Sequence, residues 1–345
     1  MSHFQIAPPP KGHEDSTIIA SVSLGKDSTA MLCALRELGV SFRAVFADTG
    51  WEAPETYDQL GVIEQALGIT IEKVGFEGGM RAAILHRAGF PTRMQRFCTK
   101  QLKVLPLRAY HDRVIVETGL DTVSVVGIRA DESADRRDAA LFEYSDEWRG
   151  YVWRPLVAAT VEDVLALHHR HGVPVNPLYK RGHGRVGCYP CIYSSKEELA
   201  LIAEHAPWRI DEIRELERTC ESLRAERNAE KPGRYAHMSA TFFRAAVADR
   251  YESQRAWVPA PPAGKRPKGR LAPEQGPPPE GASPEGSWRI VRVPVYKPMH
   301  IDDMVSWANT SRGGRQLKVI REEPQGGCFR WGMCEPPAKP SAGEE

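Results

Sequence analysis

A short polar loop near the N-terminus has the residue types of an anion-binding site. The stretch SVSLGKDST covers residues 21–29 and follows the apolar run at 17–20. Where a strand turns into a helix through small residues, backbone N–H groups converge at the helix N-terminus, and the helix dipole favours negative charge there. Lys26 would add positive charge, and the Asp27 carboxylate is a ligand type that suits Mg²⁺. The predicted anion site consists of Ser23, Gly25, Lys26, Asp27, Ser28 and Thr29.

The spacing of this loop differs from that of the common kinase-type phosphate loop. The Walker pattern G-x-x-x-x-G-K-[ST] requires a glycine five residues before Gly25, and this chain has Ala20 there. A ligand-free turn between a strand and a helix is the simpler alternative. The Lys-Asp-Ser run directly after a strand favours the anion site.

Two later apolar runs also end in residues that can contact a nucleotide or a metal ion. Asp48 closes the run FRAVFAD, where it either faces a metal or a ribose hydroxyl or only caps a turn. Gly127 and Arg129 follow the run TVSVV, and a charge beside the end of a parallel strand lies at the crevice where such sheets bind ligands. Arg136 is a further candidate; the alternative is that Arg136 and Arg137 form a solvated surface pair.

Cysteine spacing predicts a metal or cluster site rather than disulfide bonds. The chain has seven cysteines, an odd number, and a reducing compartment keeps thiols free. Cys188 and Cys191 form a C-x-x-C pair, and Cys98 stands in the basic run RFCTK. Spacing alone favours a structural zinc site, with a redox dithiol as another interpretation of the pair. The candidates for a further zinc ligand are His183, Cys328 and Cys334.

The elements that must position these residues follow an α/β pattern. From Ser16 to about Ser194, short apolar runs alternate with amphipathic segments such as 30–38 and 55–67. This alternation predicts a parallel, twisted sheet with helices on both faces and a ligand at the carboxyl ends of the strands. Cys33 and Cys220 fall on apolar faces of predicted helices and are expected to be packing residues.

The whole chain of 345 residues divides into six predicted segments. The last folded segment is expected to contain a strand over WRIVRVPVY and a short helix near residues 301–308. The six are a flexible N-terminus (1–15), the α/β domain (16–194), a helical extension (195–257), an extended or disordered Pro-rich linker (258–287), a small C-terminal module (288–335) and a tail (336–345).

Charge and hydropathy point to a soluble, cytoplasmic protein without a membrane partner. Lys and Arg total 46 against 45 Asp and Glu, so no overall electric field attracts the protein to a polyanion. A nucleic acid would have to be bound by local patches. No run of eighteen apolar residues occurs, and the N-terminus lacks the pattern of a signal peptide.

The 21–29 loop resembles the PP-loop of the ATP pyrophosphatases, whose pattern is S-G-G-x-D-S. Leu24 stands where that family usually has Gly. The segment from Gly127 through Ser133 to Arg136 resembles the G-I-R-x-x-x-S-x-x-R segment of the phosphoadenosine phosphosulfate (PAPS) reductase family within the PP-loop group. The resemblance covers roughly residues 17–198 and follows the order of the family's segments.

The cysteine segments extend this resemblance to the cluster-bearing relatives of the PAPS reductases. Those proteins hold a [4Fe-4S] cluster with a C-C-x-x-K-type segment and a later G-C-x-P-C. This chain has Phe97 in place of the first cysteine of the pair, so the resemblance implies that Cys98, Cys188 and Cys191 hold the cluster and leave one iron open. Four basic residues are expected to lower the pKa of these thiols: Arg96, Lys100, Arg181 and Arg185.

The resemblance implies an adenine nucleotide alpha hydrolase-like fold and an enzyme that cuts Mg²⁺-ATP between the α and β phosphates. In this interpretation Lys26, Asp27 and Arg129 are the catalytic residues, and the loop stabilises the departing pyrophosphate. Sulfite-forming reductases of the family end in E-C-G-hydrophobic-H, whereas this chain ends CEPPAKPSAGEE. The chain therefore resembles the ATP-using sulfur-insertion branch, which includes DNA phosphorothioation and phage-borne proteins.

The partners implied are ATP, a sulfur donor such as a cysteine desulfurase, and DNA or RNA as acceptor. The runs at 265–270 and 312–315 are basic, and Trp307 or Trp331 could stack on a base. The competing interpretation of both runs is a solubilising linker and an ordinary loop. Two rival functions remain open: a PAPS or adenylyl sulfate reductase with Cys328 or Cys334 as nucleophile, and a nucleotide-binding component of a defence complex without turnover.

Overall fold

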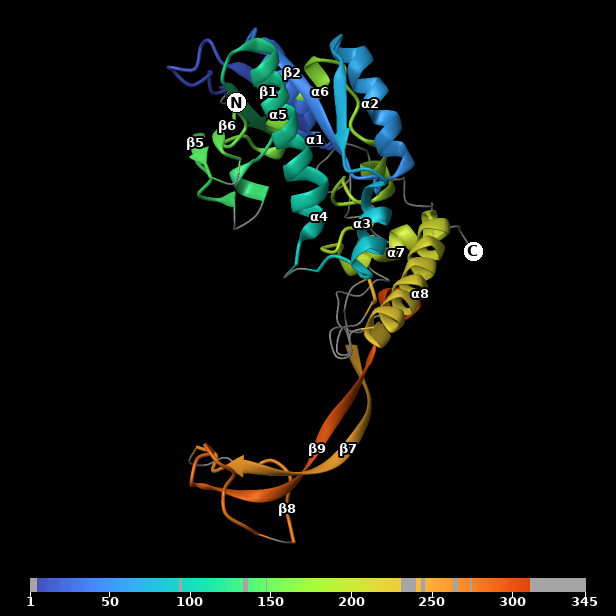
Figure 1. Cartoon of the computed structure of the whole chain (residues 1–345). Helices are drawn as coiled ribbons and strands as arrows, with labels where there is room; N and C mark the ends of the chain where they lie inside the picture. Colours follow the sequence, from blue (N-terminus) through green and yellow to red (C-terminus); the bar gives the residue numbers. More distant parts are fainter. Residues whose placement is uncertain are drawn as a thin grey trace, which may run out of the picture.

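A six-stranded, mostly parallel sheet lies at the centre of the N-terminal half of the protein (Figure 1). The computed structural model describes residues 5–92, 95–132, 136–146, 148–230, 240–242, 246–262, 266–273 and 275–310. The strand order is β3-β2-β1-β4-β6-β5, and only β5 runs antiparallel to its neighbour. The strands are β1 (Thr17–Val22), β2 (Phe42–Asp48), β3 (Ile71–Gly75), β4 (Thr122–Val126), β5 (Phe142–Ser145) and β6 (Gly150–Trp153).

Helices cover both faces of this sheet, as the alternating sequence pattern predicts. Successive residues of β1 point to opposite faces, so Ile18 and Ala20 join one apolar core while Ile19 joins another. The first core contains α1 (Lys26–Glu37), α2 (Pro54–Leu67) and α6 (Val161–Arg170). A smaller apolar core lies on the other face of the sheet, where α5 (Leu105–Thr118) packs. The predicted fold class is confirmed.

A second apolar core lies beyond the sheet and contains no strand of it. It joins the cysteine-bearing loops to α3 (Gly79–Arg87), α7 (Lys196–His205), α8 (Pro207–Glu230) and α9 (Ile301–Ala308). Cys220 packs in this core and Cys33 in the first one, both fully buried, as predicted. The described helices include none that is both long and apolar enough to cross a bilayer.

A buried carboxylate ties the last described helix to this second core. Glu217 on α8 is 1% exposed and accepts hydrogen bonds from the backbone N–H groups of Phe242 and Ile301, both at 2.9 Å. The Ile301 N–H belongs to the first turn of α9, whose N–H groups have no partner inside the helix. Glu217 thus serves as the acceptor for two separate chain segments.

A long β-hairpin leaves the body of the protein and ends far from the sheet (Figure 1). It consists of β7 (Ala246–Pro259) and β9 (Gly286–Pro298), which pair antiparallel, and of β8 (Arg270–Leu271) on the outer edge of β9. We call residues 246–298 the arm. Its described side chains are exposed or half-buried, except for Ala272.

The arm corrects part of the predicted chain organisation. A helix was expected up to residue 257, but α8 ends at Glu230 and the described residues from Ala246 onward form a strand. The reason is tertiary: β7 is stabilised by pairing with β9, which is distant in sequence, and no local signal reveals that pairing. The predicted linker, residues 258–287, overlaps the end of β7 and the start of β9 and includes β8 between them. The strand and short helix predicted from residue 288 onward are present as β9 and α9.

Candidate nucleotide and thiol site

The loops after β1 and β4 meet where the strand order of the sheet reverses. Strand β1 lies between β2 and β4, so the connections leaving β1 and β4 diverge. In parallel sheets this point leaves a crevice at the carboxyl ends of the strands, and ligands bind there. The loop at residues 23–28 follows β1, and residues 127–129 follow β4.

The loop after β1 is held in shape by its own hydroxyl groups and by one strained residue. The Ser28 hydroxyl accepts from the Ser23 N–H at 3.1 Å and donates to the Gly25 carbonyl at 3.1 Å. Leu24 has a φ of 59°, in the left-handed region that costs a non-glycine residue roughly 1–2 kcal/mol. Its side chain is 1% exposed, and burying a leucine contributes about 1.5–3 kcal/mol. Burial offsets the strain, so Leu24 replaces the family's usual glycine with the turn intact.

Gly127 allows β4 to approach the start of α1 closely. A Cβ atom at this position would lie 2.7 Å from the Asp27 carbonyl oxygen and 2.7 Å from the Ser28 Cα atom. Both contacts are with backbone, which cannot move aside as a flexible side chain can. The structure therefore gives Gly127, a predicted cofactor-binding residue, a steric role in bringing two strand ends together.

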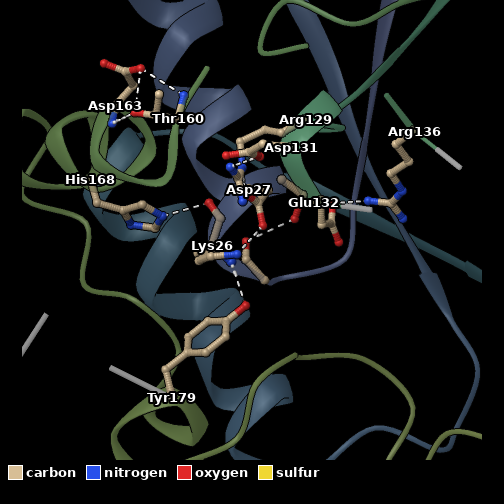
Figure 2. Close-up of polar contacts among 12 residues, drawn as sticks. Lys26, Asp27, Arg129, Asp131, Glu132, Arg136, Thr160, Asp163, His168 and Tyr179 are labelled. Atoms are coloured by element: carbon tan, nitrogen blue, oxygen red, sulfur yellow. Dashed lines mark hydrogen bonds and ion pairs between the residues drawn. The ribbon is translucent and has the colours of Figure 1, made fainter. Parts of the chain in front are cut away.

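A chain of buried charges runs from the loop after β1 to the loop after β4 (Figure 2). Lys26 Nζ lies 2.6 Å from Asp27 Oδ2, and Arg129 Nε lies 2.5 Å from Asp27 Oδ1. Arg129 also pairs with Asp131. The side chains of Lys26, Asp27 and Arg129 are 6%, 14% and 3% exposed. The three residues predicted to be catalytic are thus in direct contact.

The two cations determine the ionisation of the carboxylate between them. Burial opposes the charged form of Asp27, but the attraction and hydrogen bonds of Lys26 and Arg129 outweigh it and hold the pKa of that carboxyl below its ordinary value. Asp27 is therefore an anion at neutral pH. An incoming polyphosphate would compete with it for the same two cations.

Two residues that the sequence analysis missed hold the backbone of Lys26. The Tyr179 hydroxyl accepts a hydrogen bond from the Lys26 N–H at 3.2 Å, and His168 Nε2 lies 2.8 Å from the Lys26 carbonyl oxygen (Figure 2). His168 Nδ1 lies 2.9 Å from the Val173 carbonyl oxygen. Burial lowers the pKa of His168. Neither residue carries a local motif; only the fold brings them to the loop.

The remaining predicted nucleotide-binding residues have other contacts in the structure. Asp48 Oδ1 accepts from the Gly50 N–H and from the Tyr57 hydroxyl, both at 2.8 Å, which is the turn-capping arrangement. Arg136 forms an ion pair with Glu132 at the surface. Among the described residues it forms no ion pair with Asp27. Thr29 is buried within α1. Ser133, part of the family segment, lies outside the described residues.

The C-x-x-C loop packs against the carboxyl end of β2. Cys188 forms an isolated β-bridge with Glu52, and its sulfur lies 3.9 Å from the Thr49 hydroxyl. The Tyr189 N–H donates to the Trp51 carbonyl oxygen at 2.8 Å. Since β2 is the neighbour of β1, these contacts bring the cysteine loop to the same edge of the sheet as the loop after β1.

Lys103 is the cation that faces the three thiols, and the sequence analysis did not single it out for this role. It lies in a short π-helix, Lys100–Val104, a distortion often found at functional sites. Its pKa is raised, first by attraction to Cys188 and then, against the effect of burial, by Glu52, Cys191 and Cys98. Lys103 therefore interacts electrostatically with all three predicted metal ligands.

The expected lowering of the thiol pKa is not found at Cys98 or at Cys188. Burial raises the pKa of Cys98 and of Cys188, and Lys103 opposes the rise at both. Arg181 pairs with Glu55 instead, and Arg96 lies over the ring of Tyr193 at 5.3 Å. The sequence shows that Arg96 and Arg181 are near the cysteines along the chain, but not which way their side chains point.

The three thiols are of the type that binds zinc or an iron-sulfur cluster, but they are not arranged around a common metal position. Cys98, Cys188 and Cys191 are free and half-buried, and the pKa interactions of Cys98 and Cys188 both include Cys191. In the part of the chain that the structure describes, no group of three or more His, Cys, Asp or Glu side chains is positioned to hold a metal ion. His183, the zinc alternative, is buried against Tyr189, and burial lowers its pKa to about 4. Cys328 and Cys334 lie outside the described residues.

The fold is an α/β domain with a buried cluster of charges and a cysteine loop at one edge of its sheet, and comparison with known proteins identifies its family. The model of the phosphoadenosine phosphosulfate reductase domain matches residues 17–194, slightly more than half of the chain. The chain belongs to this family. The matched region ends before α7, so α7, α8, α9 and the arm lie outside it.

The chain is also similar to individual proteins of other organisms. An uncharacterized 37.8 kDa protein of Escherichia phage 186 is 36% identical over 260 residues, which cover 59% of this chain and 75% of the phage protein. An adenosine 5′-phosphosulfate reductase of Geobacillus thermodenitrificans is 28% identical over 177 residues, covering 50% of this chain and 72% of the reductase. A crystal structure of PAPS reductase from Candida auris matches with a TM-score of 0.39 and 18% identity, covering 50% of this chain and 81% of that one.

Proposed function

We propose that this protein is an ATP pyrophosphatase that adenylates an acceptor and replaces the activated oxygen with sulfur. One observation carries the proposal: Tyr179 bonds the Lys26 N–H, and the same chain segment continues to Cys188. The nucleotide loop and the thiol loop are therefore parts of one connected structure. ATP chemistry and sulfur chemistry at neighbouring places are what such a transfer requires.

The first step that we propose is attack by an acceptor oxygen on the α-phosphorus of ATP. The bond to the β,γ-pyrophosphate breaks, pyrophosphate leaves, and the acceptor proton passes to solvent. Lys26 and Arg129 stabilise the charge that develops on the departing group, because they are preorganised in a site from which water is largely excluded. Asp27 is the residue that would hold Mg²⁺ once phosphate oxygens have taken over its two cations, and the ion would neutralise phosphate charge.

In the second step a sulfur nucleophile at the oxidation level of sulfide displaces AMP. The bond between the acceptor and its activated oxygen breaks, a bond to sulfur forms, and no net electrons are transferred. A donor of the cysteine-desulfurase class would deliver the sulfur as a persulfide. A thiol reductant would supply the two electrons that bring this sulfur to the sulfide level, and would itself be oxidised to a disulfide. Cys98, Cys188 and Cys191 would hold a [4Fe-4S] cluster, or zinc in the alternative, and Lys103 would offset the negative charge of the thiolates. When bound, the cluster would supply an open iron as a place for sulfur.

Pyrophosphate release from Mg²⁺-ATP tests the first step. We expect Lys26→Ala to lower the rate by at least about 100-fold, since it removes one of the two cations that stabilise the departing group. Lys180→Ala, an exposed lysine, is the matched control. If the wild-type protein released no pyrophosphate with any acceptor, binding of ATP without turnover would be the remaining function.

A second candidate function is reduction of an adenylylated sulfate, because a relative at 28% identity is an adenosine 5′-phosphosulfate reductase. That reaction needs a cysteine nucleophile for the sulfur atom, and the candidates Cys328 and Cys334 lie outside the described residues. Incubation with PAPS or adenosine 5′-phosphosulfate and a thiol separates the two functions. Sulfite release that Cys328→Ser or Cys334→Ser abolishes would establish the reductase and refute sulfur insertion.

A further inference from the structure

The arm contains a hollow formed by all three of its strands. Its volume is about 780 Å³, and it is lined by Ser253 and residues 257–259 of β7, by residues 268–270 at β8, and by residues 290–292 of β9. Apart from Ala272, the described side chains here are at least partly exposed, and no described arm residue belongs to the three apolar cores. The arm therefore contributes little to the core of the body.

The turn before β8 is built to bring two cations against β9. Gly269 has a φ of 81°, and a Cβ there would lie 2.5 Å from the Ile290 carbonyl oxygen, so only glycine fits without displacement. Arg289 donates two hydrogen bonds to the Gly269 carbonyl, at 2.6 and 3.0 Å. These contacts fix Lys268 and Arg270 at the rim of the hollow.

The hollow has positive charge that no carboxylate neutralises. Three cations line it, Lys268, Arg270 and Arg292, and no acidic residue is among the lining residues. In the described part of the arm these three side chains make no ion pair, whereas Arg250 nearby pairs with Glu252. Arg292 lies over the ring of Tyr251 at 5.1 Å, and Tyr251 is 55% exposed.

The chemistry of this surface favours one class of partner. Cations beside exposed aromatic rings match the phosphates and bases of a nucleic acid. A two-fold pairing of arms from two copies of the chain would place the same cations against each other, which is unfavourable. An anionic lipid surface would neutralise the charges, but a flat surface would not fill the hollow.

We propose that the hollow of the arm binds the phosphate backbone of a nucleic-acid strand, so that the protein captures its acceptor as a polymer. The inference rests on the proposed function, to which it adds the class of the acceptor. Lys268, Arg270 and Arg292 contact successive phosphates, and Tyr251 offers a stacking surface. A strand of about fourteen residues extends roughly 45 Å, so the arm holds the polymer away from the ATP loop while another part of it reacts.

Fluorescence anisotropy of labelled nucleic acids, without ATP, tests this inference on the full chain. The probes are single-stranded DNA and RNA of about 20 nucleotides and the corresponding DNA duplex. We expect the triple variant Lys268→Ala, Arg270→Ala, Arg292→Ala to bind at least about tenfold more weakly. Its salt dependence should fall by about two units of slope, since three phosphate contacts contribute about 0.7 each on a single strand. The matched control removes three exposed cations of the body: Lys11→Ala, Arg36→Ala and Lys73→Ala.

A second variant keeps every charge and changes only the shape of the hollow. Gly269→Ala should weaken binding several-fold because the added methyl group displaces the turn from β9. Equal weakening by the triple variant and its control, or no binding by the wild-type protein, would overturn the proposal. So would a preference for anionic vesicles over all three nucleic acids, or a dimer in size-exclusion chromatography that the triple variant dissociates. Because the assay contains no ATP, its failure is distinct from a failure of pyrophosphate release.

Discussion

The loop after β1 and the arm represent opposite ways of using polar side chains. In the loop, Lys26 contacts Asp27 beside it and Tyr179 and His168 far along the chain, so its geometry depends on several elements at once. In the arm, β7 pairs with β9, and the described side chains remain accessible. A change in the loop should therefore spread into the fold, whereas a change in the arm should stay local.

The largest loss in the free energy of unfolding is expected for Asp27→Asn. The substitution leaves two buried cations, Lys26 and Arg129, without their shared anion, and breaking a buried ion pair typically costs about 3–5 kcal/mol. Urea unfolding at pH 7 measures the loss. Asp131→Asn is the control, because Asp131 also pairs with Arg129 but its side chain is 51% exposed. Equal losses for both variants would contradict the distinction between a buried and an exposed partner.

The lowered pKa of Asp27 predicts how the free energy of unfolding depends on pH. The folded-state pKa of Asp27 is lowered below its ordinary value of 3.8, so its contribution is fully present above that value and is lost as the pH falls through the folded pKa. The stability difference between the wild-type protein and Asp27→Asn should therefore be constant from pH 5 to 7 and narrow below about pH 4. A difference that stayed constant down to pH 2 would show that folding does not lower the pKa of Asp27.

A somewhat smaller effect is expected where α9 joins the second core. Glu217→Ala leaves the N–H groups of Phe242 and Ile301 without their acceptor, and a buried unsatisfied donor costs about 1–3 kcal/mol. We expect a loss of roughly 2–4 kcal/mol in thermal or urea unfolding. Glu221→Ala on the same helix should be nearly neutral, because its side chain is 47% exposed. A neutral Glu217→Ala would mean that the two hydrogen bonds of Glu217 do not help to hold α9, which also pairs with α8 through Arg214 and Asp302.

Gly127→Ala tests whether the two strand ends must touch. Forcing a methyl group to within 2.7 Å of backbone atoms should cost about 1–3 kcal/mol and lower pyrophosphate release, since α1 and its loop must move away from Arg129. Gly61→Ala provides a control of opposite sign: this glycine lies inside α2 with nothing within 4 Å of the added atom. Alanine there should stabilise the helix by about 0.5–1 kcal/mol. Normal activity of Gly127→Ala would refute the steric role.

The sequence predicted what depends on local pattern and missed what depends on distant contacts. Strand and helix alternation up to residue 194 and the buried Cys33 and Cys220 follow from spacing along the chain. The clustering of Lys26, Asp27 and Arg129 follows from the parallel sheet, which brings strand ends together.

The missed residues share a different property. Tyr179 and His168 reach the loop from more than 140 positions away. Lys103 interacts with Cys188 and Cys191, which lie more than 80 positions further along the chain. The segment at 246–257 was expected to be helical because nothing near it indicates its partner strand. Each of these is a non-local contact, which single-sequence patterns do not encode.

The smallest effect on the stability of the body is expected from removing the arm. A nearly unchanged melting temperature would support the contrast with the loop most strongly. Ala246 and Pro298 are paired across the base of the hairpin, so a short Gly-Ser linker can replace the residues between them. No described arm residue belongs to the apolar cores of the body, so the melting temperature should change by only about 2 °C or less. Nucleic-acid binding should be lost, and with it the pyrophosphate release that depends on a nucleic-acid acceptor. A large fall in melting temperature would show that the arm is a structural part of the body, since the loss of a peripheral two-stranded ribbon cannot by itself unfold a packed core.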